Sequence, residues 1–377
     1  MLLAFTNGRL LTDAGIESNR GLLVRDGRIE AIVGTKDIVG ADRTIDLAGR
    51  LLAPGFIDVQ VNGGGGVLFN DDPSVASIAA IGRAHRRFGT TGFLPTLISD
   101  DLDVVARAID ATRAAIESRV PGVLGIHIEG PFLNTNRRGV HDAGKLRRLD
   151  AAAVELLSTP HGGLTMVTLA PERTTPELIR ALSDAGVIVS AGHTNATFDE
   201  LQPALAAGLR GFTHLFNAMS PLTSREPGAV GAALADSESW CGLIVDGHHV
   251  HPEVMKFALR AKRHERFMLV TDAMPSVGSD LKSFRIQGRL ITVTGDKIMD
   301  DAGGLAGAHL DMASAVRNAV KLLGLDLATA LRMGSRNPAE FLKLETAGRL
   351  APGRRANLVL LDDELQVQGT WIDGNDA

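Results

Sequence analysis

The sequence predicts an α/β protein made of a closed (β/α)8 barrel (a TIM barrel) and a small β-sandwich built from both chain ends. Between residues 54 and 345, eight apolar runs alternate with helical stretches, whereas the two termini share short strand-like runs separated by turns. Apolar strands separated by helices indicate a parallel sheet covered on both faces. Eight of them indicate a closed barrel, which takes about 250 residues.

The terminal segments are expected to form one small domain, from residues 1–53 together with 346–377. Strand-like runs lie at both ends, in AFTNGRLLT, GLLVRDGRIEAIV and RTIDLAGRLLAP near the start and in GRLAPGRRANLVLLD and QVQGTWIDG near the end. Asp26 and Gly27 stand between two apolar runs, which is a hairpin signal. The likeness of the two ends predicts that they pair with each other.

The barrel is expected over residues 54–345. Its eight predicted strands are 55–61, 92–98, 123–129, 164–170, 187–193, 211–217, 241–247 and 267–273. Helical patterns lie in the gaps at 74–88, 101–118 and 175–186. An insertion at 276–307, with FRIQGRLITVTGDKIMD, predicts a hairpin over the barrel mouth.

Composition excludes several classes of protein. The formal net charge of -5 argues against a nucleic-acid-binding surface, which is normally basic. Cys241 is the only cysteine, so no intramolecular disulfide is possible and a reduced, cytoplasmic compartment fits best. No run approaches the roughly 20 apolar residues of a membrane helix, and the first residues do not resemble a signal peptide.

Four polar residues each end one of the apolar runs: Glu129, His193, His214 and Asp272. Active sites of such barrels lie at the C-terminal ends of the strands. Two imidazoles and one carboxylate form the ligand pattern of a catalytic zinc ion, with a fourth position left for water. Asp272 is then suited to accept a proton from that water. The plainer alternatives are an ion-paired structural Glu129 and a helix N-cap at Asp272.

The first barrel strand has Gln60 and Asn62 where many metal-dependent hydrolases carry a His-x-His pair. Neutral amides are poor ligands, so the positions of a second metal are expected to be vacant. His127, on the same face of its strand as Glu129, is interpreted as a packed histidine rather than a ligand. The run Gly63–Gly66 lacks a following Lys-Ser/Thr, so it does not indicate a phosphate-binding P-loop.

Further candidates lie in loops after the strands. His248, His249 and His251 are interpreted as substrate contacts and caps rather than as a second metal site, on the expectation that only one of them need point inward and that no adjacent acid completes such a site. Arg225 offers a planar fork for phosphate or carboxylate, although a solvated arginine is equally compatible with the sequence. His141, on a loop after the third strand, is suited to polarise a carbonyl group or to orient the substrate.

At these residues the chain resembles the amidohydrolase superfamily, and within it the N-acetylglucosamine-6-phosphate deacetylase family. The matching stretches include PGFIDVQVNGGGG, HIEGPFLN, LAPE, SAGHTNAT, THLFNAMSPLTSREPG, DGHHVHP and LVTDAM. The resemblance implies one divalent ion per subunit, Zn²⁺ or else Fe²⁺, Co²⁺ or Mn²⁺, held by the three ligands named above. It also implies catalysis by Asp272 and His141, and a homodimer. The substrate contacts that it implies are His141, Asn217, the backbone of Ala218, Arg225 and His249, with Arg225 or His249 contributing across the subunit interface.

The predicted reaction is hydrolysis of the acetamide of N-acetylglucosamine 6-phosphate, in amino-sugar catabolism or cell-wall recycling. An alternative is the same chemistry on another amino-sugar phosphate, such as N-acetylgalactosamine 6-phosphate. A third is a non-catalytic barrel that serves as an assembly module.

Overall fold

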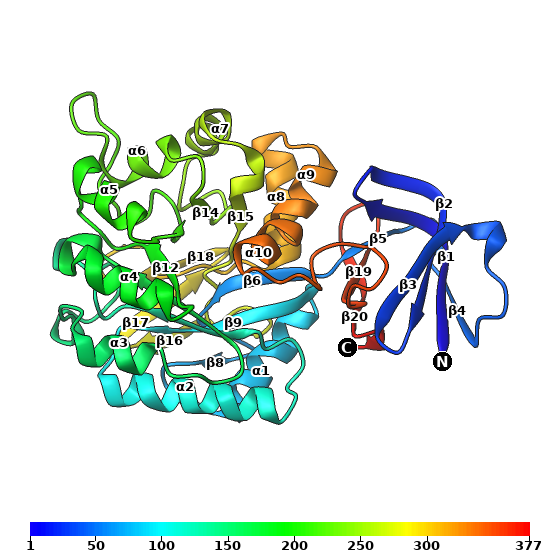
Figure 1. Cartoon of the computed structure of the whole chain (residues 1–377), viewed down its shortest axis with the longest axis horizontal. Coiled ribbons are helices and arrows are strands. Elements are labelled where there is room, and N and C mark those ends of the chain that lie inside the picture. The colour runs from blue at the N-terminus through cyan, green and yellow to red at the C-terminus, as the bar shows by residue number, and fades with distance from the viewer.

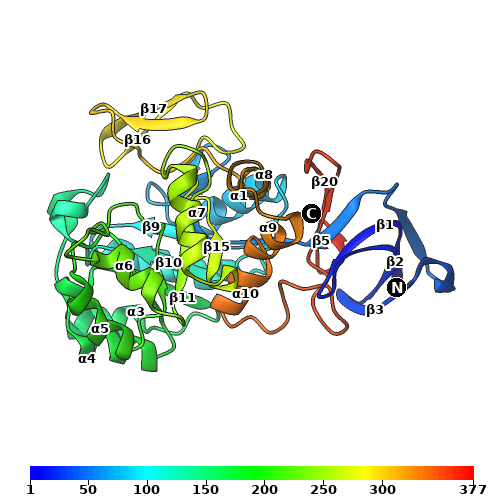
Figure 2. The ribbon, with the colours of Figure 1, turned by 90° about the horizontal axis from the view of Figure 1, so that it is seen from above.

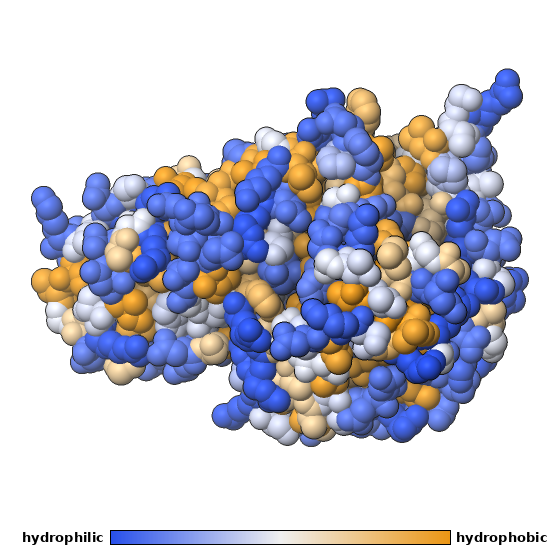
Figure 3. All heavy atoms as spheres, turned by 180° about the vertical axis from the view of Figure 1, so that it is seen from behind, coloured by the Kyte–Doolittle hydropathy of each residue, from blue (hydrophilic) through white to orange (hydrophobic).

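The computed structural model describes all 377 residues and shows two lobes. The larger lobe is the barrel with its helices, and the smaller is a β-structure that carries both chain ends (Figure 1). Figure 3 shows the two lobes from behind, with hydrophilic and hydrophobic residues mixed over both. None of the helices has the length and apolar character that a membrane crossing requires.

Eight parallel strands form the barrel sheet, in the order β15-β14-β13-β12-β11-β10-β9-β6. Each strand therefore pairs with its neighbour in the sequence, as the alternating pattern predicts, and the predicted fold class is confirmed. The strands are β6 (Phe56–Val61), β9 (Thr90–Ile98), β10 (Gly125–Glu129), β11 (Leu164–Leu169), β12 (Ile188–Ala191), β13 (Gly211–Phe212), β14 (Trp240–Leu243) and β15 (Phe267–Leu269).

The barrel closes between its first and last strands at the C-terminal rim. Val61 and Ala273 form a parallel bridge there. The backbone N–H of Asp272 donates to Gln60 O at 3.0 Å, and that of Asn62 donates to Ala273 O at 2.9 Å. The closure therefore places Gln60 and Asn62 beside Asp272.

Helices cover the outside of the barrel with their apolar faces inward. In α4, for example, the Thr175 side chain caps the N-terminus, Pro176 occupies the first turn, and Ile179 and Leu182 are buried. The helices are α1 (Val75–Arg86), α2 (Leu102–Glu117), α3 (Ala151–Leu157), α4 (Pro176–Asp184), α5 (Phe198–Ala206), α6 (Gly228–Ala235), α7 (Pro252–Ala261), α8 (Met312–Leu323), α9 (Leu327–Met333) and α10 (Arg336–Phe341).

The small lobe is a sheet built from both ends of the chain. Its path is β21-β20-β19-β5-β1-β2-β3, and β4 also pairs with β1. Asp26 and Gly27 have φ of 48° and 77°, as the predicted hairpin turn requires. The strands are β1 (Leu2–Thr12), β2 (Gly15–Arg25), β3 (Arg28–Gly34), β4 (Arg43–Asp46), β5 (Leu51–Pro54), β19 (Leu358–Leu361), β20 (Val367–Ile372) and β21 (Asn375–Asp376). The domain boundaries at 53/54 and 345/346 stay a prediction.

The insertion after β15 forms a three-stranded antiparallel sheet of β16 (Ser283–Ile286), β17 (Arg289–Thr294) and β18 (Lys297–Asp300). Figure 2 shows β16 and β17 lying above one side of the barrel lobe. Ile286 and Ile291 are buried in a cluster with Ile98 and Met274 of the rim. The insertion is thus fastened to the barrel by apolar contacts. Gly63–Gly66 lies in a short ribbon of β7 (Gly63–Gly64) and β8 (Val67–Leu68), packed on the same rim.

Candidate active site

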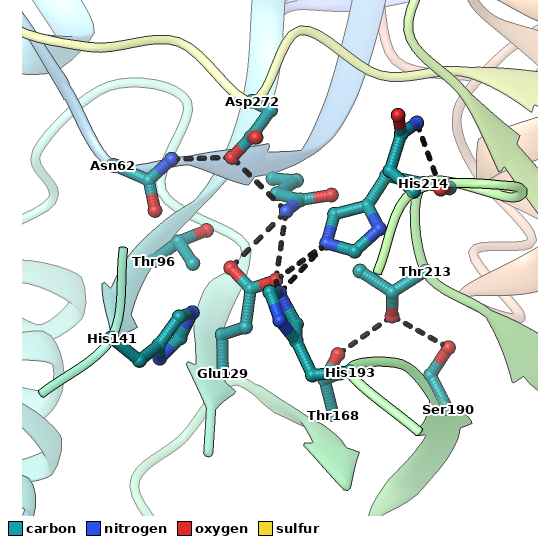
Figure 4. Close-up of polar contacts among 12 residues, drawn as sticks. Asn62, Thr96, Glu129, His141, Thr168, Ser190, His193, Thr213, His214 and Asp272 are labelled. Carbon is teal, nitrogen blue, oxygen red and sulfur yellow. Dashed lines mark hydrogen bonds and ion pairs between the residues drawn. The ribbon is translucent and has the colours of Figure 1, made fainter. Parts of the chain in front are cut away.

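Three side chains converge at the rim of the barrel. Glu129 is the last residue of β10, while His193 and His214 follow β12 and β13. Glu129 Oε1 lies 3.2 Å from His193 Nε2 and 3.0 Å from His214 Nε2. The two Nε2 atoms are 3.1 Å apart. Figure 4 shows these three groups pointing at one another from the ends of β10, β12 and β13.

The backbone at the rim turns sharply where these residues stand. His193, His214 and Asp272 have φ of 48°, 34° and 51°, a left-handed conformation that residues other than glycine adopt uncommonly. Such conformations cost about 1–3 kcal/mol each and cluster at functional sites. At the ends of short strands they turn each side chain back over the barrel mouth.

The donor set fits a divalent ion. Neighbouring ligands of a tetrahedral zinc ion lie about 3.3 Å apart, given bond lengths near 2.0–2.1 Å, which is close to the separations at this site. The Nδ1–H of His193 donates to Arg137 O at 2.8 Å, so its Nε2 carries the lone pair that a metal requires. Burial alone would raise the pKa of Glu129, but the two imidazoles hold that pKa well below its usual value. The carboxylate is therefore ionised.

Asp272 stands next to this triad and is held by one oxygen. Its Oδ1 accepts hydrogen bonds from Asn62 Nδ2 at 2.6 Å and from Gln60 Nε2 at 3.1 Å. Gln60 Nε2 also lies 3.1–3.2 Å from both oxygens of Glu129. The two amides, at the positions predicted to lack the ligands of a second metal, thus orient Asp272 through Oδ1 and leave its Oδ2 free. No helix begins at Asp272, so the N-cap alternative is wrong.

Burial and the charge of Glu129 raise the pKa of Asp272 to about 6. A divalent cation at the adjacent ligands would lower that pKa again, because it favours the carboxylate. Asp272 is therefore available as a proton acceptor at neutral pH.

His141 lies beside the triad and is 2% exposed. The backbone N–H of Ser99 donates to its Nδ1 at 3.2 Å, and Ser99 Oγ lies 2.7 Å from the same atom. Nδ1 is therefore the acceptor, so the ring proton is on Nε2. Burial and the neighbouring His193 lower the pKa of His141 to about 3, which keeps the ring neutral. His141 is thus a neutral hydrogen-bond donor.

His127 lies deeper in the barrel. Its Nδ1 is 3.2 Å from Thr96 Oγ1 and its Nε2 is 2.7 Å from Thr168 Oγ1, so both nitrogens are engaged away from the ligand triad. Burial lowers its pKa to about 4. The structure therefore places His127 beneath the site as a packed, neutral histidine.

A pocket of about 340 Å³ opens above these groups. It is lined by the triad, Asp272 and His141, and by the predicted substrate contacts Asn217, Ala218 and His249 of the same chain. Arg225 does not line it: its side chain lies on an exposed turn before α6. The structure thus brings together every predicted site residue except Arg225.

The histidine-rich segment after β14 contains an acid that the sequence interpretation overlooked. Asp246 accepts backbone hydrogen bonds from His248 and His249, and its Oδ2 lies 2.6 Å from His249 Nδ1. The prediction that no acid lies adjacent to these histidines is therefore wrong, because Asp246 stands two residues before His248 and pairs with His249 of the same loop. His249 is the inward-pointing member, whereas His251 accepts a hydrogen bond from the Glu253 N–H and caps α7.

Two other residues near the pocket were not predicted from the sequence. Arg137 lines the pocket, and its Nε donates to Asn195 Oδ1 at 3.0 Å. Glu172, in the LAPE stretch, accepts hydrogen bonds from Thr194 Oγ1 at 2.6 Å and from Asn195 N at 2.6 Å, which fixes the turn after His193. The consecutive arginines Arg137 and Arg138, just before His141, were the only local signal for the first of them.

Comparisons with known proteins agree with this geometry. Residues 51–376 match the Amidohydrolase family. The chain is 44% identical to the N-acetylgalactosamine-6-phosphate deacetylase of Shewanella sp. (strain ANA-3), covering 99% of this chain and 95% of that one. It is 33% identical to the N-acetylglucosamine-6-phosphate deacetylase of Haemophilus influenzae (strain ATCC 51907 / DSM 11121 / KW20 / Rd), covering 99% of both.

Among solved structures, the N-acetylglucosamine-6-phosphate deacetylase from Pasteurella multocida superposes with a TM-score of 0.97 at 34% identity, covering 100% of both chains. The superposition extends over both lobes, because it covers the whole of each chain. The chain therefore belongs to the amidohydrolase family, on the branch that contains these amino-sugar phosphate deacetylases.

Proposed function

We propose that the chain is a hydrolase that removes the acetyl group from N-acetylglucosamine 6-phosphate, giving glucosamine 6-phosphate and acetate. The observation that carries the proposal is the meeting of Glu129, His193 and His214 with Asp272 in one pocket of a chain that matches such deacetylases along its whole length. The non-catalytic alternative finds no support, because both the ligand set and the proton acceptor are present.

The side chains of the rim divide the chemistry between them. A divalent ion on the three ligands would supply Lewis acidity, lowering the pKa of water toward 7 and polarising the amide oxygen. Asp272 Oδ2 takes the proton of the attacking water, and the new C–O bond forms at the acetyl carbon. The Nε2–H of His141 donates to the carbonyl oxygen as negative charge develops there. Asp272 then returns the proton to the nitrogen as the C–N bond breaks.

Zinc fits two imidazoles and one carboxylate, and we propose one ion per subunit because Gln60 and Asn62 replace the ligands of a second. Ferrous iron, cobalt and manganese accept the same donors, so metal analysis of the purified protein decides the identity. The buried thiol of Cys241 supports a reducing, cytoplasmic setting.

The phosphate requires a cationic contact, and Arg137 is the only arginine or lysine in the pocket lining. We propose that Arg137 and His249 form the anion-binding side of the pocket within one subunit. A guanidinium has several donors, and the hydrogen bond to Asn195 uses only the Nε of Arg137.

We further propose that a second copy of the chain supplies Arg225. Two large apolar side chains, Leu222 beside it in the sequence and Phe257 on α7, are 56% and 64% exposed in the single chain. A copy of the chain packed against this part of the barrel lobe would cover both side chains.

Replacement of Arg225 tests the dimer. We expect Arg225→Ala to form normal dimers and to raise KM for the phosphorylated sugar about ten-fold or more, with a smaller effect on kcat, since a charged hydrogen bond contributes about 1.5–3 kcal/mol. Mixing Arg225→Ala subunits with inactive Asp272→Asn subunits should restore activity, because one site of each heterodimer is intact. A monomeric mass in light scattering, or no recovery in mixed dimers, would contradict the shared site.

The C4 epimer is the second candidate, favoured by the 44% identity to a galactosamine-type relative. Acetate release should be measured with the N-acetylated 6-phosphates of glucosamine and galactosamine, and with unphosphorylated N-acetylglucosamine as control. The ratio of kcat/KM between the two phosphates assigns the sugar. Equal activity on the unphosphorylated sugar would contradict the anion-binding assignment, and no acetate from any of them would reject the deacetylase.

The pH profile follows from Asp272. A general base works as the carboxylate, so activity must rise with pH through its pKa and level off above. Because a bound cation lowers the value of about 6, the acid limb of kcat/KM should have its midpoint below pH 6. A pH–rate profile of the metal-loaded enzyme measures this, and a midpoint above pH 7 would exclude Asp272 as the base.

A further inference from the structure

Gln287 stands at the tip of the hairpin that joins β16 to β17. Gln287 and Gly288 have φ of 47° and 86°, the conformation of a tight two-residue hairpin turn. Below the tip, Ile286 and Ile291 are buried against the rim. The turn thus holds the Gln287 side chain at a defined place beside the barrel mouth.

The amide of Gln287 binds two separate segments of the rim. Its Nε2 donates to the carbonyl oxygen of Ser99, which follows β9. Its Oε1 accepts the backbone N–H of Asp142 at 2.7 Å. Both ends of one amide are therefore engaged, one with the end of a barrel strand and the other with the loop after β10.

Both partners of Gln287 adjoin His141. Ser99 presents its N–H and its hydroxyl group to His141 Nδ1, and Asp142 is the next residue in the chain. The ring of His141 lies 4.5 Å from that of His193, centroid to centroid. The side chain of Gln287 therefore links the insertion to the residues that surround His141.

We propose that Gln287 is a positioning residue for His141, so that docking of the hairpin sets the direction of the His141 Nε2–H. The amide ties Ser99 to Asp142 and thereby fixes both the backbone and the ring of the histidine between them. Lys145, which pairs with Asp100 and Asp101, also joins these two loops, whereas the Gln287 amide binds Ser99 itself and the residue that follows His141. The hairpin is then part of the catalytic apparatus although none of its strands contacts the triad.

The other end of the insertion also approaches the rim. Asp296, in the turn between β17 and β18, has its Oδ2 3.0 Å from His248 Nε2, next to the substrate contact His249. The insertion therefore contacts both the loop that carries His141 and the loop that carries His249.

The kinetic test is a double-mutant cycle, and it rests on the proposed function. We expect Gln287→Ala to lower kcat about 10- to 100-fold, the scale of a small misplacement of a catalytic group, with little change in KM or metal content. In a His141→Ala background the same change should have almost no further effect. An equal fall in kcat in both backgrounds would show that Gln287 does not act through His141. A rise in KM with unchanged kcat would show that Gln287 contributes to substrate binding rather than to catalysis.

A second measurement does not depend on the substrate. Hydrogen–deuterium exchange of the metal-loaded protein should become faster in residues 138–146 of Gln287→Ala, while helices on the far side of the barrel stay unchanged. Leu290→Ala, at an exposed position of β17, is the matched control and should leave both exchange and kcat as in the wild type. If the wild type releases no acetate, the proposed deacetylase function is wrong, but faster exchange in Gln287→Ala still supports the positioning of His141 by Gln287. Unchanged exchange in Gln287→Ala would overturn it.

Discussion

Asp272→Asn should reduce kcat about 10²- to 10⁴-fold, the usual contribution of general acid–base catalysis, while the metal content stays at the wild-type level. The substitution is nearly isosteric. The amide oxygen can take the place of Oδ1, where it still accepts from Asn62 and Gln60, and an NH2 group then replaces Oδ2. The variant keeps the geometry of the site and lacks only the atom that receives the proton.

Steady-state acetate release together with metal analysis measures this result. Asp71→Asn is a suitable control, because Asp71 is an exposed carboxylate on the loop before α1 and should tolerate the change. Near-normal turnover of Asp272→Asn would show that another group carries the proton, and a loss of metal would make the kinetic result uninformative about the base.

Glu129→Gln should remove both the metal and the activity. The change replaces the only anionic ligand by an amide. Mutation of a residue that merely supports a ligand already weakens metal binding about 10- to 100-fold, so we expect the metal affinity of Glu129→Gln to fall at least about 100-fold. The carboxylate also accepts from Gln60 Nε2, which would then face a second amide. Chelator-treated wild type should regain activity when a divalent ion is restored, whereas Glu129→Gln should not.

The number of metal ions per subunit after dialysis is the quantity to measure. Glu155→Gln, a change at an exposed carboxylate, is the control. Wild type should hold about one ion. Full metal content in Glu129→Gln would remove this residue from the ligand set. Two tightly bound ions in the wild type would show that Gln60 and Asn62 do not leave the second position vacant.

The predicted strands and the rim residues came from a property that is local in sequence. Each barrel strand is a short apolar run, and its last residues must lie at one rim because the strands are parallel. Glu129, His193, His214 and Asp272 could therefore be placed together without any knowledge of their distances. The same reasoning placed the insertion at 276–307, since its alternating pattern interrupts the helical ones.

Contacts between distant segments could not be predicted in this way. Nothing near Gln287 indicates that its amide reaches Ser99 and Asp142, because those partners are defined only by how the hairpin docks. Arg137 enters the pocket through the course of an irregular loop. Arg225 shows the opposite case: its motif suggested a substrate contact, yet its own subunit leaves it on an exposed turn.

The strand pairing of the small lobe sets the order in which the two lobes can fold during synthesis. β5 (Leu51–Pro54) pairs with β19 (Leu358–Leu361), so the edge of β5 stays without its partner until nearly the whole chain has left the ribosome. The barrel, made of consecutive β/α units, can assemble during that time. The last strands then seal the sheet behind it. A ribosome that stalls late would therefore release a barrel with an open, aggregation-prone edge beside it, which is a target for chaperones and proteases.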